Sequence, residues 1–102
     1  MKTLDTVRNQ LEIGEFDFSR HALKRAVERN ISEAEIMQLG KAAILIEEYP
    51  DDKNSPSCLL LGYTQAGCPL HLQVSLAERP LVKIITLYQP NPKEWIDDRD
   101  RR

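Results

Sequence analysis

The chain has 102 residues, of which 41% are hydrophobic and 29% are charged, and its formal net charge is −2. This length and composition indicate one soluble globular domain that covers residues 1–102. No apolar run approaches the roughly 20 residues of a membrane-spanning helix, so no membrane association is expected. The first residues, Met1–Asp5, lack the apolar core of a signal peptide, which favours a cytoplasmic location. The net acidity is not typical of a nucleic-acid-binding protein.

The first part of the chain has helical periodicity in three segments. Gly14 ends the first segment, and Ser19 is the predicted N-cap of the second. Ser32 and Glu35 form a capping box at the start of the third. Between the first two segments, Phe16 and Phe18 are expected to anchor the chain to the core. The predicted helices are Thr3–Ile13, Arg20–Glu28 (or Arg29) and Ser32–Gly40.

In the second part of the chain, apolar and polar residues alternate in short segments, as is typical of half-buried strands. Clusters of Pro, Gly, Asn and Asp separate these segments. The connections are too short for crossover helices, so the strands should form an antiparallel meander. Pro90, Pro92 and Trp95 are expected to close the chain with a turn. The predicted fold class is α+β, with two to three N-terminal helices packed on a four-stranded antiparallel β-meander. Its strands are Ala43–Tyr49, Cys58–Tyr63, Pro69–Leu76 and Leu81–Tyr88.

The second predicted helix carries a polar row of candidate functional residues. His21 and Arg25 are four residues apart, with Cβ atoms about 5–6 Å from one another, and Arg29 continues the row. His21 lies in the first turn, where the helix dipole disfavours a protonated imidazole and so favours a general base. The same residues also fit an ordinary solvated basic face. The opposite face is expected to be buried and consists of Ala22, Leu23, Ala26 and Val27.

Two predicted strands carry the other candidates. His71 lies on the polar face of the strand that contains Leu70–Val74. Thr86 and Tyr88 share one face of the last strand, to which simple alternation also assigns Ile84. An imidazole, a hydroxyl and a phenol are groups that can serve acid–base chemistry on a phosphate. Strand propensity alone also accounts for Thr and Tyr at these positions.

Metal and cofactor chemistry has little support in the sequence. There is no Cys-x-x-Cys or His-x-x-x-His spacing, and the four glycines form no phosphate-binding loop. Cys58 is expected to face the region of Ser75 across a hairpin, whereas Cys68 lies in the turn. These positions are too far apart for a disulfide, so both thiols are expected to be reduced. We therefore expect neither a metal nor a cofactor.

Five motifs follow one another along the chain: Phe18–Ser32, Ile46–Asp52, Leu59–Gly62, Pro69–Leu72 and Ile85–Pro90. This ordered set resembles a known bacterial family, the domain of unknown function 4258 (DUF4258). The resemblance runs from about Phe16 to Trp95. That family has been grouped by fold with small RNases and toxins, including RelE-type toxins, barnase-like enzymes and EndoU-type endoribonucleases.

The resemblance implies a metal-independent, toxin-like endoribonuclease. In EndoU-like members, two histidines and a Ser/Thr-x-Tyr pair line the active site, and His21, His71 and Thr86-Leu87-Tyr88 are similar in kind and order. One histidine would deprotonate the 2′-hydroxyl of RNA, and the other would protonate the leaving 5′ oxygen. The catalytic candidates are His21, His71 and Tyr88, and the substrate-binding candidates are Arg25, Arg29 and Thr86.

The alternative is a non-catalytic RNA- or protein-binding module of the same fold. The net acidity favours it, as does the lack of a clear match for the lysine that completes the EndoU-like site. A homodimer through a strand edge, such as Pro56–Leu61, is a further possibility. Catalysis requires His21, His71 and Tyr88 to converge within about 10 Å around one groove, with Arg25 at its rim.

Overall fold

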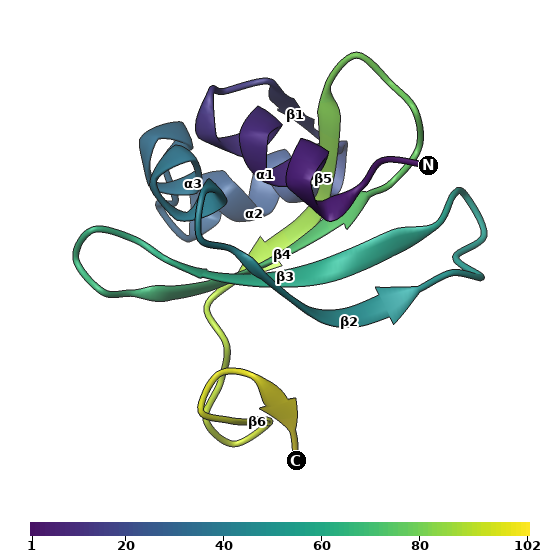
Figure 1. The fold of residues 1–102 in the computed structure, drawn as a ribbon. Helices are drawn as coiled ribbons and strands as arrows, with labels where there is room; N and C mark the ends of the chain where they lie inside the picture. The colour runs from purple at the N-terminus through teal and green to yellow at the C-terminus, as the bar shows by residue number, and fades with distance from the viewer.

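The computed structural model describes all residues, 1–102, as three helices, a five-stranded sheet and a two-stranded C-terminal hairpin (Figure 1). The helices are α1 (Leu4–Glu12), α2 (Arg20–Glu28) and α3 (Glu33–Gly40). The strands of the sheet are β1 (Phe16–Phe18), β2 (Ile44–Tyr49), β3 (Ser57–Tyr63), β4 (Pro69–Ser75) and β5 (Val82–Tyr88). The hairpin consists of β6 (Trp95–Ile96) and β7 (Asp100–Arg101). No helix is both long enough and apolar enough to cross a membrane.

Ser19 and Ser32 are N-caps as predicted, and Thr3, which was predicted to lie within the first helix, is the N-cap of α1. The side chains of Thr3, Ser19 and Ser32 each accept a hydrogen bond from the backbone N–H three residues further on. The capping box is complete, because the Glu35 side chain also accepts from the Ser32 backbone N–H. These bonds satisfy backbone donors that a helix leaves free at its N-terminus. Three helices are present where two to three were predicted, although a strand, β1, lies between α1 and α2 in the chain.

The sheet has the strand order β1-β5-β4-β3-β2. Strands β2 to β5 form the predicted antiparallel meander. The prediction of only four strands was wrong, because β1 adds a fifth strand that is parallel to β5. In the chain, β1 comes between α1 and α2. Phe16 and Phe18 pair in register with Val82 and Ile84, and both phenylalanines pack against the core. Three residues are too few to give a strand signal in the sequence.

The edges of this sheet are β1 and β2. Strand β3 is hydrogen-bonded on both sides, to β2 and to β4. The expectation that Pro56–Leu61 offers a free edge for homodimerisation was therefore wrong. The two cysteines are free, with Cys58 buried opposite Val74 and Cys68 half-buried at the turn.

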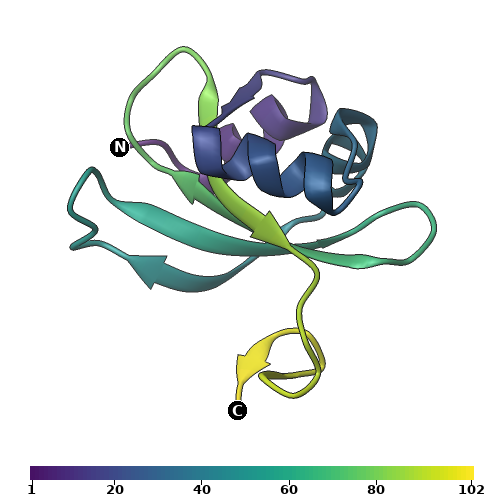
Figure 2. The same cartoon turned by 180° about the vertical axis from the view of Figure 1, so that it is seen from behind.

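The helices cover one face of the sheet, and the C-terminal segment lies against the other (Figures 1 and 2). The core between helices and sheet is built of aliphatic side chains from both layers, such as Leu11, Ile36 and Leu72, which are fully buried. Helix α2 contributes only Ala22 and Ala26 to it, because the helix packs closely on β5 through these small residues. The expectation that Leu23 and Val27 are also buried was wrong, since they are 52% and 73% exposed.

A β-bulge in β5 changes which side chains face the helices. Gln73 pairs with Thr86, whereas the next residue of β4, Val74, pairs with Ile84, so Ile85 is an extra residue. Ile84 and Leu87 are therefore both in the core, and Thr86 and Tyr88 face the other way. Simple alternation had assigned Ile84 to the face of Thr86 and Tyr88, which was wrong because it does not anticipate the bulge.

Candidate functional site

Helix α2 runs alongside the part of β5 that β1 leaves unpaired. At the start of the helix, Ser19 Oγ donates a hydrogen bond of 2.8 Å to the backbone carbonyl of Ile85. Just after its end, Arg29 Nη1 donates one of 2.8 Å to the carbonyl of Leu87. Two side chains thus satisfy carbonyls on the free edge of β5. They also align α2 with the strand that carries Thr86 and Tyr88.

We use the name β5-edge surface for two adjoining sets of residues: the polar row of α2 (His21, Arg25 and Arg29) and the outward residues of β5 (Thr86 and Tyr88). His21 is exposed, and Arg25 forms a 2.8 Å ion pair with Glu28. Arg29 and Tyr88, together with Gln89, line a surface hollow of about 330 Å³. The polar row of α2 and the outward residues of β5 therefore meet at Arg29 and Tyr88.

His71, in contrast, is fully buried behind Tyr88. Its Nε2 lies 2.6 Å from the backbone carbonyl of Asp98, which can only accept, so Nε2 carries the proton. Nδ1 then accepts a hydrogen bond from the Tyr88 hydroxyl at 3.2 Å. The imidazole also packs edge-to-face on Trp95, with ring centroids 4.5 Å apart. Both ring nitrogens are used within the protein.

The C-terminal segment, residues 91–102, covers His71. Trp95 is 2% exposed, and the Arg101 guanidinium stacks 4.6 Å from its ring centroid. Arg101 also donates two hydrogen bonds, of 2.7 and 3.1 Å, to the carboxylate of Glu47 on β2. That carboxylate accepts a further hydrogen bond from the Tyr49 hydroxyl. The segment is thus attached to the sheet by an aromatic contact and an ion pair.

The sequence did not predict this cover. The turn that aims the Asp98 carbonyl at His71 has Asp97 and Asp98 in the left-handed region, at φ 52° and 63°. Asp adopts this conformation more readily than most residues, but no short-range pattern identifies its tertiary partner. The only signal was a tryptophan after two prolines, since a large aromatic side chain is seldom left exposed.

Burial keeps His71 and Tyr88 uncharged near neutral pH. It lowers the pKa of His71 below its usual value, and the hydrogen bond to the Asp98 carbonyl only partly opposes this. Burial also raises the pKa of Tyr88. Nearby, the hydrogen bond from Arg101 lowers the pKa of Glu47, so this carboxylate stays ionised. A neutral His71 is consistent with the proton on Nε2 alone.

These positions bear directly on the catalytic prediction. Tyr88 contacts His71, Arg29 shares a hollow with Tyr88, and Thr86 lies two residues away on the same face. His21 is exposed on the helix, whereas His71 is sealed under the C-terminal segment. The two imidazoles therefore do not line one open groove.

The buried His71 makes stability depend on pH. Because its pKa is lower in the folded than in the unfolded chain, the unfolded chain binds the proton more tightly. The contribution of His71 to the free energy of unfolding is complete above the pKa of histidine in the unfolded chain, about 6.5. It is lost as the pH falls toward the lower pKa of His71 in the folded chain. We expect urea denaturation to give a smaller free energy of unfolding at a pH of about 5.5 than at about 7.5.

Two variants check this assignment. His71→Gln removes the titrating group and should flatten the pH dependence over this range. His21→Gln should retain it, because His71 is still present. Equal slopes in the wild type and in His71→Gln would show that His71 is not the group responsible.

The fold and the site define a small α+β domain with one helical layer, an open polar strand edge and a histidine buried under its C-terminal segment. The chain belongs to the family described as domain of unknown function (DUF4258), whose model matches residues 18–89. No curated protein and no solved structure matches it. The grouping with RelE-, EndoU- and barnase-like folds stays a prediction.

Proposed function

We propose that this domain is a non-catalytic RNA-binding module that holds single-stranded RNA along the β5-edge surface. The observation that carries the proposal is the hollow in which the Arg29 guanidinium, held by the Leu87 carbonyl, lies beside Tyr88. Single-stranded RNA is commonly held by cations that follow the phosphates and by aromatic rings on which bases stack. The proposal requires both kinds of group at one place.

The cations follow the helix. Arg25 and Arg29, on or just after α2, are the cations of the β5-edge surface, with Glu28 as the one acidic residue between them. This local positive charge contrasts with the net charge of −2 for the whole chain. A phosphodiester backbone is attracted to such a local patch, and the attraction weakens as salt is added.

Tyr88 contributes its ring in this proposal. Its hydroxyl proton is directed to Nδ1 of His71, so it is not free to donate to a phosphate oxygen. The ring is half-buried and lines the hollow beside Arg29. The imidazole of His71 packs edge-to-face on this ring, with centroids 5.2 Å apart, so His71 is a positioning residue that supports the ring through packing.

Burial of His71 also favours binding over cleavage. An acid or base must reach the reacting oxygen directly or through one water. His71 is 0% exposed, and both of its nitrogens are used within the protein. A two-histidine reaction would require the C-terminal segment to leave the sheet.

The two unpaired thiols fit a reducing cytoplasm, where RNA is also found.

Salt-dependent binding of a fluorescein-labelled single-stranded RNA of mixed sequence, followed by anisotropy, tests the proposal. Arg29→Gln should weaken binding and reduce the slope of log K against log salt by about 0.7, the value for one lost phosphate contact. Lys53→Gln, which removes a cation from the exposed β2–β3 loop, is the matched control and should change neither. Thermal unfolding establishes that both variants are folded.

Tyr88 variants separate the ring from its hydroxyl. Tyr88→Ala should weaken RNA binding by roughly 5- to 150-fold, which corresponds to the loss of one stacked base. Tyr88→Phe should bind RNA nearly as well as the wild type. Metal-free cleavage of the RNA that is lost in both His21→Ala and His71→Ala would contradict the proposal and support the nuclease.

A further inference from the structure

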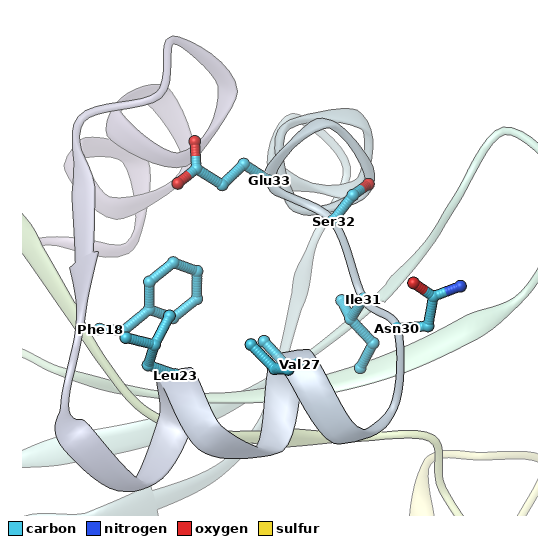
Figure 3. Close-up of a pocket in the computed structure, with 8 residues that line it drawn as sticks. Phe18, Leu23, Val27, Asn30, Ile31, Ser32 and Glu33 are labelled. Atoms are coloured by element: carbon cyan, nitrogen blue, oxygen red, sulfur yellow. The ribbon is translucent and has the colours of Figure 1, made fainter.

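An apolar groove lies between α2 and the start of α3 (Figure 3). It has a volume of about 330 Å³, and its apolar lining is formed by Phe18, Leu23, Ala26, Val27 and Ile31. Figure 3 shows Leu23 and Val27 pointing from α2 toward the space in front of Phe18 and Ile31. By helical spacing, Leu23 and Val27 face away from Arg25 and Arg29. The groove is therefore separate from the β5-edge surface.

Much of this apolar surface is uncovered. Leu23 is 52% exposed and Val27 is 73% exposed, although they are one helical turn apart and adjacent on the surface. Phe18 and Ile31 are partly buried and join the groove to the core. Contiguous exposed apolar side chains with a polar rim are typical of an interaction site.

The charges at the rim on α2 are basic. Arg20 and Lys24 are exposed, and each lies three residues before one of the apolar pair, Leu23 and Val27 respectively. Neither takes part in any of the four ion pairs of the chain. A partner with carboxylates next to its apolar residues would pair with these two cations. Glu33, the one charged residue that lines the groove itself, disfavours carboxylates of a partner near the start of α3.

We propose that this groove binds an acidic amphipathic helix of a partner protein. Apolar residues of the helix, spaced i and i+4, would pack on Leu23 and Val27, and carboxylates on its α2 side would pair with Arg20 and Lys24. This is the helix-in-groove mode of recognition. A second copy of the chain fits less well. Its α2, which exposes Leu23 and Val27, carries the same basic residues, and the aliphatic residues Val7, Leu11, Ile36 and Leu39 of α1 and α3 are buried in their own core.

A synthetic helical peptide tests the proposal on the full chain. The probe is about 15 residues long, the length at which an isolated helix becomes stable, with leucines at i and i+4 and glutamates on the flanking positions. A matched peptide carries lysine in place of each glutamate. We expect the acidic peptide to bind and to shift the NMR signals of Leu23 and Val27, and the basic peptide to bind at least tenfold more weakly.

Exposed-site variants assign the contacts. Val27→Ser should weaken binding of the acidic peptide about tenfold, as truncation of an interface anchor commonly does. Leu45→Ser, at an exposed leucine on β2, is the matched control and should have no effect. Lys24→Glu should weaken the acidic peptide and strengthen the basic one, whereas Lys53→Glu should change neither.

Several results would overturn the proposal. These are equal binding of the two peptides, binding that Val27→Ser leaves unchanged, and concentration-dependent dimerisation that Val27→Ser abolishes. The last result would make the occupant a second copy. The test is independent of RNA binding. Arg29→Gln should leave peptide binding intact, and Val27→Ser should leave RNA binding intact.

Discussion

Replacement of Trp95 by alanine is expected to lower the free energy of unfolding by about 3 kcal/mol. The side chain is 2% exposed and contacts both the His71 imidazole and the Arg101 guanidinium. Its loss removes the contact that holds the C-terminal segment on the sheet. This value is at the low end of the destabilisation that replacement of a buried aromatic residue by alanine causes. We choose the low end because a terminal segment can detach without unfolding the core.

Urea denaturation followed by far-UV circular dichroism measures this effect, since Trp95 is the only tryptophan and its fluorescence is lost in the variant. Ile96→Ala is the neighbouring control; Ile96 is 42% exposed, so a change within about 0.5 kcal/mol is expected. Trp95→Ala should also reduce the pH dependence attributed to His71, because the imidazole then becomes accessible to water. A Trp95→Ala protein as stable as the Ile96→Ala control would indicate that the segment is detached in solution.

The second large effect is expected for Gly40→Ala, at the end of α3. A Cβ atom at this position would lie 2.7 Å from Leu11 Cβ and 2.8 Å from the backbone nitrogen of Glu12. Both atoms belong to, or are fixed to, the backbone of α1, so the two helices would have to separate. We expect destabilisation of about 1–3 kcal/mol from this overpacking.

Overpacking and helix propensity predict opposite changes in stability for Gly40→Ala. At an exposed helical position, alanine is more stable than glycine by about 1 kcal/mol, so propensity alone predicts stabilisation. Ala34→Gly, at an exposed position of the same helix, measures that propensity term in the reverse direction. A Gly40→Ala protein more stable than the wild type would show that α1 and α3 are not this close.

Sequence patterns predicted the parts of the fold that depend on neighbouring residues. The caps at Ser19 and Ser32 and the alternation in the four long strands act over a few residues, so the helices and the meander could be predicted. The pairing of β1 with β5 could not, because its partners are remote in the chain and Phe16–Phe18 is too short to be periodic. The same limit applies to the bulge at Ile85, which depends on the register with β4.

The candidate site was predictable to a similar extent. Helical spacing put His21, Arg25 and Arg29 in one row, and strand alternation assigned His71 to the face away from the core. Alternation identifies a face, however, and carries no information on what covers it. The burial of His71 depends on Trp95 and on the carbonyl of Asp98, which come from beyond the last long strand. Leu23 and Val27 were misassigned because an amphipathic pattern does not specify how far a helix is rotated over a sheet.

The parallel pairing of β1 with β5 has a consequence for the order of folding. Phe16 cannot pair with Val82, nor can the Ser19 backbone donate to the Ile84 carbonyl, until β5 has been synthesised. The backbone N–H of Lys2 likewise bonds to the carbonyl of Leu76 at 2.8 Å. Such contacts give a high contact order, which slows folding. The first two helices therefore leave the ribosome before the strand on which they dock exists, and the domain completes its fold only after β5 has been synthesised.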